Sequence, residues 1–287
     1  MREAVKKHKM LIVDGNNLLF QMFYGIPTKI YNKRGRTIHA TIGFVSAIQR
    51  MIKTYAIDRC VVVFDCDSSQ ERKEILEDYK GNRPQDWETL PMDEVPFFEE
   101  EYIRECLAYL NITTLDSCGM EADDLIASIA LKEERENEVY IASFDSDFFQ
   151  LINENVSVIR YRGKHTKVVD LVTFMQEFSF PPNRYVLFKS LTGDTSDNVH
   201  GVPAIGKKRA TELVCVYPDI EALSMGNLDF LPQKARESLY SSLEIVRRNI
   251  RLIMLEEKPI EKYCACFNAE RILETNSQVL SACRIFD

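Results

Sequence analysis

Residues 10–14 read Met-Leu-Ile-Val-Asp, a short apolar run that ends on an acidic residue. The pattern returns twice, since the apolar runs that begin at Val61 and Val139 lead into Asp65 and Asp145. Such short, strongly apolar runs are typical of strands that are buried on both faces of a parallel sheet. The exits of parallel strands lie on one edge of a sheet, where open α/β folds bind their ligands. The sequence therefore predicts that these acids converge at one edge.

Helical patterns alternate with these strands through the first half of the chain. We expect helices at about 39–55, 70–78, 96–110 and 121–134, and further strands at 112–115 and 156–160. This alternation predicts an α/β fold with a doubly wound, mainly parallel sheet. Beyond Pro181 helical patterns dominate, at 183–191, 207–217 and 232–255. We therefore expect an α/β core over residues 1–180 and a helical subdomain over residues 181–287.

Composition narrows the class of protein. The 287 residues are 45% hydrophobic and 28% charged, as in soluble globular proteins. No apolar stretch approaches the roughly 20 residues of a membrane span, and Asp14 interrupts the first apolar run, so we expect neither a membrane segment nor a signal peptide. Eight scattered cysteines, without a CxxC pair, and four histidines argue against a disulfide framework or a zinc site. A reduced, cytoplasmic protein is expected.

Two further acidic clusters add to the three strand exits. Glu121-Ala-Asp-Asp opens an expected helix, and Gly193-Asp-Thr-Ser-Asp lies early in the helical half. The helix dipole favours acids in a first turn, which accounts for one or two of the three acids there. Converging carboxylates repel one another unless a cation neutralises them, and oxygen ligands favour Mg²⁺ or Mn²⁺. The candidate metal ligands are Asp14, Asp65, Glu121, Asp123, Asp124, Asp145, Asp147, Asp194 and Asp197.

The net charge of −8 is concentrated in this candidate site, because the rest of the chain carries +1 once the nine acids are set aside. Basic segments lie at 29–36, 72–83, 160–167, 207–209 and 247–251. Each alone is typical of a solvated face, whereas several together fit a phosphate backbone.

The segment at 80–96 interrupts the alternation of strands and helices. It contains Gly81, Pro84, Pro91, Pro96 and the only tryptophan, Trp87. Two interpretations remain open: a mobile surface loop, or a lid or arch over the acidic edge of the sheet.

Residues 201–210 read Gly-Val-Pro-Ala-Ile-Gly-Lys-Lys-Arg-Ala. A glycine-bounded turn before a helix presents backbone N–H groups to a phosphate, and lysines in the first helical turn call for an anion. This pattern favours a helix-hairpin-helix turn that holds a DNA backbone without reading its sequence. The alternative is a helical hairpin with a polar corner.

One rival motif is set aside. Asp65-Cys-Asp-Ser-Ser resembles the nucleophile motif of haloacid-dehalogenase phosphatases, with the Gly193 segment as their late metal motif. Gly193, however, follows a helical pattern instead of a strand. That scheme also gives no role to Asp14, to the Glu121 cluster or to the turn at 201–210.

The ordered set of motifs resembles the 5′-nuclease (flap endonuclease) superfamily. The similarity is closest to its phage and bacterial branch, which includes the 5′-3′ exonuclease domain of DNA polymerase I and stand-alone phage exonucleases. One departure is Ala204, where many members have glycine. The matching motifs, over about residues 10–215, are Val13-Asp-Gly-Asn-Asn, Phe64-Asp, Tyr79-Lys-x-x-Arg, Glu121-Ala-Asp-Asp, Asp145-Ser-Asp and Gly193-Asp-Thr-Ser-Asp-Asn-x-x-Gly-Val-Pro-x-Ile-Gly-x-Lys.

The resemblance implies a PIN-like core with an arch at about 80–105, and a role for each motif. Two or more Mg²⁺ or Mn²⁺ ions would be held by the nine acids, with Asp14 and Asp65 among the catalytic residues. Lys80 and Arg83 would steer the scissile phosphate, Tyr79 would stack on a displaced base, and carbonyls of the turn would bind a K⁺-type ion. The expected DNA contacts are Tyr79, Lys80, Arg83, Gly201, Val202, Ile205, Gly206, Lys207 and Lys208.

The function that the resemblance implies is a metal-dependent 5′-3′ exonuclease and flap endonuclease. Its substrates would be branched or 5′-flapped duplex DNA and also RNA–DNA hybrids. A monomer in the cytoplasm of a bacterial or phage-infected cell is expected. The alternative is a catalytically silent protein of the same fold that binds branched DNA, and the complete acidic set favours the enzyme.

Overall fold

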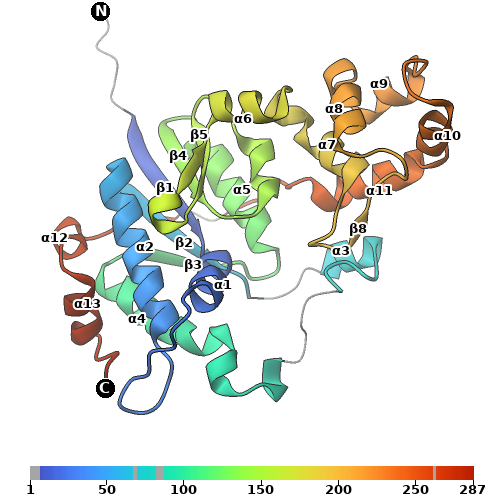
Figure 1. Cartoon of the computed structure of the whole chain (residues 1–287). Coiled ribbons are helices and arrows are strands. Elements are labelled where there is room, and N and C mark those ends of the chain that lie inside the picture. The colour runs from blue at the N-terminus through green and yellow to red at the C-terminus, as the bar shows by residue number, and fades with distance from the viewer. Residues whose placement is uncertain (1–6, 67–69, 82–86, 261–262) are drawn as a thin grey trace, which may run out of the picture.

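Six strands form the central sheet, in the spatial order β3-β2-β1-β4-β5-β6 (Figure 1). The computed structural model describes residues 7–66, 70–81, 87–260 and 263–287. The first five strands are parallel, and β6 runs antiparallel to β5 at the edge, so the expected mainly parallel sheet is confirmed. The strands are β1 (His8–Asp14), β2 (Arg59–Phe64), β3 (Thr113–Asp116), β4 (Asn137–Ala142), β5 (Val156–Arg160) and β6 (Lys167–Val169).

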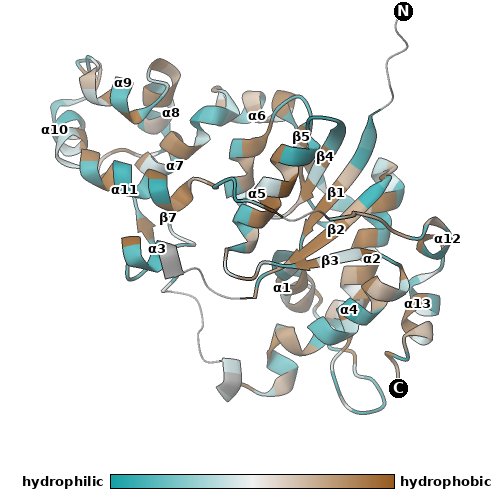
Figure 2. Cartoon of the chain, turned by 180° about the vertical axis from the view of Figure 1, so that it is seen from behind, coloured by the Kyte–Doolittle hydropathy of each residue, from teal (hydrophilic) through white to brown (hydrophobic). Residues whose placement is uncertain are grey.

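Helices cover both faces of this sheet, and the strands supply residues to the two larger hydrophobic clusters, one on each face. Met10 and Ile12 of β1 pack with α5 (Ala122–Glu133) in one cluster. Leu11 and Val13 pack in the other cluster with α1 (Gly15–Gly25), α2 (His39–Tyr55) and α4 (Glu100–Tyr109). All four side chains are fully buried. In Figure 2 these strands appear as an apolar layer between helices whose outer faces are more hydrophilic. Burial on both faces explains why β1 is continuously apolar instead of alternating.

The helices differ from the sequence expectation mainly at short elements. The expected helix at 39–55 is α2 without any shift, whereas the expected helix at 232–255 is two helices, because Ser242 leaves the helical conformation. Helices α1, α6, α9, α12 and α13 were not expected. The helices are α1 (Gly15–Gly25), α2 (His39–Tyr55), α3 (Gln70–Ile75), α4 (Glu100–Tyr109), α5 (Ala122–Glu133), α6 (Leu171–Phe178), α7 (Tyr185–Thr192), α8 (Lys207–Val216), α9 (Ile220–Met225), α10 (Gln233–Ser241), α11 (Leu243–Ile253), α12 (Ala269–Ile272) and α13 (Asn276–Ala282).

Helices α7 to α11 form a lobe beside the sheet, and a small antiparallel pair, β7 (Gly193–Asp194) and β8 (Val199–His200), extends from this lobe toward α3 (Figure 1). Three-residue to six-residue 3₁₀ turns complete the fold. Of these, η1 (Trp87–Thr89), η2 (Met92–Glu94) and η3 (Pro96–Glu99) lead into α4, and η4 (Ser146–Leu151) follows β4.

The last helices of the chain do not extend the helical lobe. Ile272, Val279 and Leu280 join the hydrophobic cluster of α2 and α4, and Gln49 of α2 donates to the carbonyl of Glu274 over 3.1 Å. In Figure 1 α12 and α13 lie beside α2, at the end of the sheet away from the helical lobe. The expected helical subdomain over 181–287 is therefore wrong for these residues, while the boundary near residue 180 stays a prediction.

None of the helices in the described part of the chain combines the length and the apolar character that crossing a membrane requires.

Candidate active site

Four of the predicted acids line one cavity at the carboxyl edge of the sheet. Asp14 follows β1, Asp65 follows β2, Asp145 follows β4, and Asp123 lies in the first turn of α5. The cavity has a volume of about 610 Å³, within the range of roughly 300–1,000 Å³ that is usual for ligand sites. The predicted convergence of strand-exit acids is thus what the structure shows. We call these four residues the cavity acids.

Local hydrogen bonds fix the positions of the cavity acids. Asp14 caps α1 by accepting from the Asn17 amide over 3.0 Å, and it also accepts from the Ser143 hydroxyl over 2.8 Å. The same hydroxyl accepts from the Asp145 amide over 3.0 Å, so Ser143 connects the exits of β1 and β4. The Asp14 carboxylate is therefore held before any ligand arrives.

A further hydroxyl positions the acid that follows β2. Asp65 accepts from the Ser117 hydroxyl over 2.8 Å, and its own amide donates to the side chain of Asn16 over 3.0 Å. Asp65 is thereby held between the exit of β3 and the start of α1.

The electrostatics of the cavity acids favour a bound cation. Burial raises the pKa of Asp14 to about 6, and Asp145 and Asp65 add to this against the two hydrogen bonds that lower it. Burial and the neighbouring Asp145 and Asp14 also raise the pKa of Asp123 well above its usual value, although Lys80 opposes them. Several crowded carboxylates with oxygen donors on one cavity fit a hard divalent cation.

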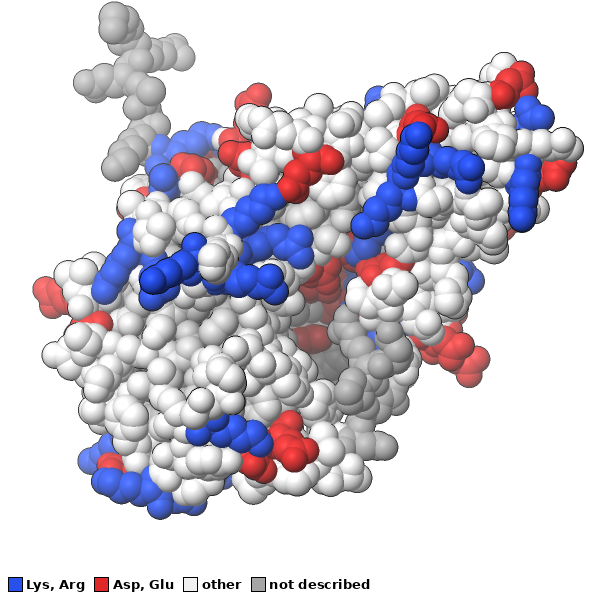
Figure 3. Space-filling model, in the orientation of Figure 1, with Lys and Arg blue, Asp and Glu red and all other residues white. Residues whose placement is uncertain are grey.

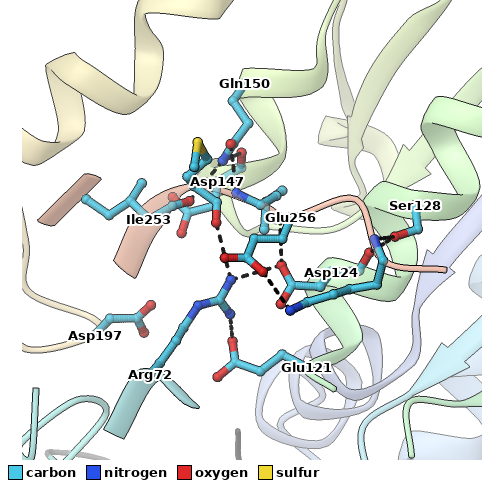
Figure 4. Close-up of polar contacts among 12 residues, drawn as sticks. Arg72, Glu121, Asp124, Ser128, Asp147, Gln150, Asp197, Ile253 and Glu256 are labelled. Atoms are coloured by element: carbon cyan, nitrogen blue, oxygen red, sulfur yellow. Dashed lines mark hydrogen bonds and ion pairs between the residues drawn. The ribbon is translucent and has the colours of Figure 1, made fainter. Parts of the chain in front are cut away.

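Two predicted ligands are engaged by an arginine that the sequence analysis did not single out. Arg72 of α3 pairs with Glu121 and, at 2.9 Å, with Asp124, as Figure 4 shows. Asp124 also accepts from the amide of Glu256 over 3.0 Å, and neither Glu121 nor Asp124 lines the cavity. Asp124 therefore acts here as an anchor between α3, α5 and the segment after α11, and its predicted role as a metal ligand is not supported by this geometry.

A second acidic group lies behind the first. Carboxylate oxygens of Asp147, Asp194 and Asp197 lie within 4.8 Å of one another, and Asp147 and Asp197 are buried. The ammonium of Lys189, on α7, pairs with Asp147 and with Asp194, the latter at 2.5 Å. We call these four residues the rear cluster.

Charge compensation within the rear cluster is incomplete. Burial and Asp145 raise the pKa of Asp147 to about 7 despite the pairing with Lys189. Burial would lower the pKa of Lys189, but Asp147, Asp145 and Asp194 outweigh it and raise that pKa. A buried lysine that is held protonated by three acids supplies part of the positive charge that a cation would supply. The only sequence signal for Lys189 is that it is the single charged residue in the mainly apolar helix Tyr185–Thr192.

Lys80 is the predicted arch residue that reaches the cavity. Its ammonium lies 3.2 Å from a carboxylate oxygen of Glu121, and its side chain lines the cavity with the acids. Its backbone has a φ of +54° and its amide donates to the carbonyl of Asp197 over 3.1 Å, which ties Lys80 to the rear cluster. Arg83, the second predicted arch cation, lies outside the described residues.

Tyr79 does not occupy the position that the sequence predicted. It is 5% exposed, its ring packs with Val199, Leu252 and Ile253, and its hydroxyl lies 3.4 Å from Asp197. A buried ring cannot stack on a base, so that expectation is wrong for this arrangement. Among the described residues, four other aromatic side chains line the same cavity, and we call them the aromatic wall: Phe20, Tyr24, Trp87 and Phe97.

The aromatic wall is a connected unit. The ring of Phe20 lies 5.7 Å from Trp87 and 5.3 Å from Phe97 in edge-to-face geometry. Trp87 begins η1 and Phe97 lies in η3, so the η1–η3 segment borders the cavity as a lid or arch would. The sequence analysis missed this group because its members come from three elements, α1, η1 and η3, and share no spacing.

The turn at 201–210 combines packing with exposed charge. Val202 and Ile205 are buried, and the Val202 amide donates to the carbonyl of Leu191 over 2.8 Å, so these two residues serve the core. A Cβ on Gly201 would collide with the backbone of Thr192 and Gly193, so this glycine permits close packing.

The rest of the turn suits contact with a partner. Gly206 precedes α8 with open space around it, so a side chain there would meet no other part of the described chain. Ala204 has a φ of +63°, which explains why glycine suits this position. Lys207 and Lys208 are exposed at the start of α8.

Charged side chains of opposite sign gather at different places on the surface. Figure 3 shows acidic side chains inside a hollow between the two lobes, while basic side chains gather on the sheet lobe, over the β5–β6 region, and on the helical lobe. A partner with a negatively charged backbone could therefore contact both lobes and reach the acids between them.

Comparisons with known proteins agree with this geometry. Residues 9–179 match the family model of the 5′-3′ exonuclease N-terminal resolvase-like domain, and residues 180–266 match that of the 5′-3′ exonuclease C-terminal SAM fold. The chain is 32% identical to the thermostable DNA polymerase I of Thermus filiformis over 256 residues, which is 88% of this chain and 29% of that protein. It is 31% identical to DNA polymerase I of Mycobacterium bovis, over 85% of this chain and 26% of that protein. The chain thus spans less than a third of the length of these relatives.

Solved structures give the same fold. A flap endonuclease of bacteriophage T5, solved as a pseudo-enzyme-product complex with DNA and metal ions, is similar with a TM-score of 0.69 and 26% identity, over 86% of this chain and 89% of that one. The catalytic core of Rad2 in complex with DNA is similar in fold alone, with a TM-score of 0.60 and 15% identity, over 96% of this chain and 93% of that one. With family models that together match residues 9–266, the chain belongs to the 5′-3′ exonuclease family.

Proposed function

We propose that this protein is a structure-selective, divalent-metal-dependent 5′-nuclease that hydrolyses phosphodiesters of DNA at 5′ flaps and 5′ ends. The observation that carries the proposal is the convergence of the four cavity acids with Lys80 on one cavity. Its family membership supports the reaction class, and the bacteriophage T5 relative was solved with DNA and metal ions.

The donor set fits Mg²⁺ or Mn²⁺, since it consists of carboxylates without sulfur or imidazole. The cavity acids would hold the catalytic ions, and Glu121 would join them if it left Arg72. The rear cluster would hold a further ion only if Lys189 moved aside, because its ammonium pairs with two of the three acids. When bound, such ions activate water and stabilise charge on the transferring phosphate.

The protein's own groups account for binding and orientation. Lys80 presents an ammonium to the cavity and would contact the scissile phosphate, where a charge-assisted contact strengthens as negative charge develops. The aromatic wall would stack against unpaired bases. Such stacking does not depend on the DNA sequence, because every base has a flat face. Lys207 and Lys208 would contact the duplex backbone at a distance from the cut.

We propose branched or 5′-flapped duplex DNA as the main substrate, RNA–DNA hybrids as a second one, a monomer as the active form and the cytoplasm as its location. A K⁺ ion at the turn remains part of the proposal. The Pro203 and Ala204 carbonyls already accept from Ser238 and Arg209, so the ion would use their remaining lone pairs.

The test is cleavage of a 5′-labelled flap duplex under a Mg²⁺ titration. We expect short 5′ products that appear with Mg²⁺ or Mn²⁺ and disappear with EDTA. Tight binding of flap DNA without cleavage at any metal concentration would instead support the catalytically silent DNA-binding protein.

A further inference from the structure

Two thiols lie together at the exits of β2 and β3, next to the cavity acids. The sulfur atoms of Cys66 and Cys118 are 3.8 Å apart, and both residues are exposed. Cys66 directly follows Asp65, and Cys118 directly follows Ser117, the residue whose hydroxyl holds Asp65. No step of the proposed nuclease reaction uses either thiol.

The sheet register explains why these two cysteines face each other. Phe64 of β2 is paired with Asp116 of β3, and each cysteine lies two residues beyond that pair. The pairing continues past the strands, because the Ser117 amide donates to the Phe64 carbonyl over 3.0 Å and the Cys66 amide lies 3.3 Å from the Ser117 hydroxyl. Neighbouring strands are about 4.8 Å apart, which falls within the roughly 4.4–6.8 Å that a disulfide spans between Cα atoms.

We propose that Cys66 and Cys118 form a reversible disulfide when the protein meets a peroxide. The two thiols would then be a redox modification site beside the cavity acids. In the first step one thiol attacks a peroxide oxygen, the O–O bond breaks, and a sulfenic acid and water form. In the second step the other thiol displaces the sulfenic oxygen as a second water, which creates the S–S bond. Hydrogen peroxide accepts the two electrons and the two protons that the thiols lose.

The disulfide would act on the position of Asp65. A disulfide has an S–S length of about 2.05 Å, so the sulfur atoms must approach by about 1.8 Å. Such a shift moves the residues adjacent to Asp65 and to Ser117, and misplacement of catalytic groups by about 1 Å can slow a reaction by about a hundredfold. This consequence rests on the proposed nuclease function, whereas the modification itself does not.

Other cysteines provide internal comparisons. Cys60 and Cys106 are buried, which shields them from peroxide. Cys215 is exposed like the proposed pair, and its sulfur lies 3.5 Å from the carbonyl oxygen of Ser179. Cys215→Ser is therefore the matched control for Cys66→Ser and Cys118→Ser.

The test treats the full chain with hydrogen peroxide in EDTA, blocks remaining thiols by alkylation, and maps the peptides by mass spectrometry without reductant. We expect a linked peptide that contains Cys66 and Cys118, that persists in Cys215→Ser, and that dithiothreitol abolishes. Each single variant of the pair should lose the linkage while its other thiols oxidise as before. Oxidation of these cysteines to sulfinic acid without the linked peptide would overturn the proposal.

Flap cleavage by the same samples then tests the consequence. We expect oxidation to slow cleavage by wild type and Cys215→Ser at least tenfold, reversibly, and to leave Cys118→Ser unchanged. Equal cleavage before and after full linkage would overturn the regulatory consequence. Absence of cleavage in the fully reduced protein would instead contradict the proposed nuclease function, and the peptide map would still decide the site.

Discussion

In the metal-free protein, the buried carboxylates should make the fold less stable as the pH rises. The pKa of Asp14 allows the size of this loss of stability to be calculated. Burial raises the pKa of Asp14 from 3.8 to about 6 in the folded state. The folded protein therefore binds this proton more tightly than the unfolded chain does. The associated stability is fully present below pH 3.8 and is lost as the pH rises through 6.

The expected magnitude follows from the shift in this one pKa. Two pKa units correspond to about 3 kcal/mol, of which about half is lost between pH 5 and 7.5. For a chain of this size that corresponds to a fall in Tm of about 3 °C. The raised pKa of Asp147, about 7, acts in the same direction.

Thermal melts in EDTA at pH 5 and at pH 7.5, with wild type and Asp14→Asn, measure this contribution. The variant retains an oxygen that can accept from the Asn17 amide but cannot ionise, so its Tm should fall less over this range. Added Mg²⁺ should raise the wild-type Tm more at pH 7.5 than at pH 5, because ionised carboxylates bind the cation. Identical pH dependence of Tm in wild type and variant would refute the reasoning about burial.

Three further perturbations test separate parts of the site. Lys80→Ala should slow the single-turnover cleavage rate more than it weakens DNA binding, because the Lys80 side chain lines the cavity with the acids. A change confined to the dissociation constant would show that Lys80 only contacts the DNA backbone. Replacing both Lys207 and Lys208 with Ala should weaken the binding of duplex DNA. It should also reduce the slope of log affinity against log salt by about 0.9 for each phosphate that the protein no longer neutralises. An unchanged slope would contradict the role of the turn. Ala204→Gly should stabilise the fold by about 1 kcal/mol in urea melts, since it relieves a positive φ of +63°, and a loss of stability would show that the turn is not strained.

The sequence predicted the parts of the fold that rest on long, strongly patterned segments. The runs before Asp14, Asp65 and Asp145 are apolar because their strands are buried on both faces, and parallel topology then places the acids on one edge. Segments such as β6 and α12 are three and four residues long, too short for a period to be recognised. The position of α13 beside the sheet depends on tertiary packing, which cannot be recognised from the local sequence pattern.

The site was less predictable wherever partners come from distant segments. Arg72 meets Glu121 and Lys189 meets Asp147 only because the fold brings α3 to α5 and α7 to the end of β4. Each basic residue on its own is compatible with a solvated face. Tyr79 shows the converse, since the sequence around it is the same whether its ring is exposed or, as here, buried against Val199, Leu252 and Ile253.

The account depends most on the cavity acids as ligands of the catalytic metal, and Asp145→Asn tests that claim most directly. The asparagine can still accept from the Asp147 amide, so the local 3₁₀ turn should persist while one ligand charge is lost. Asp170→Asn is the matched control, because Asp170 caps α6 in the same way but does not line the cavity.

The measurement is single-turnover cleavage of labelled flap DNA in saturating Mg²⁺, with the DNA dissociation constant determined in parallel. We predict that Asp145→Asn lowers the cleavage rate by at least about a hundredfold, as expected when several kcal/mol of metal-derived stabilisation are lost, while DNA binding is retained or tightened. The Asp170→Asn rate should equal wild type. Cleavage by Asp145→Asn at the wild-type rate, with normal DNA binding, would contradict the account.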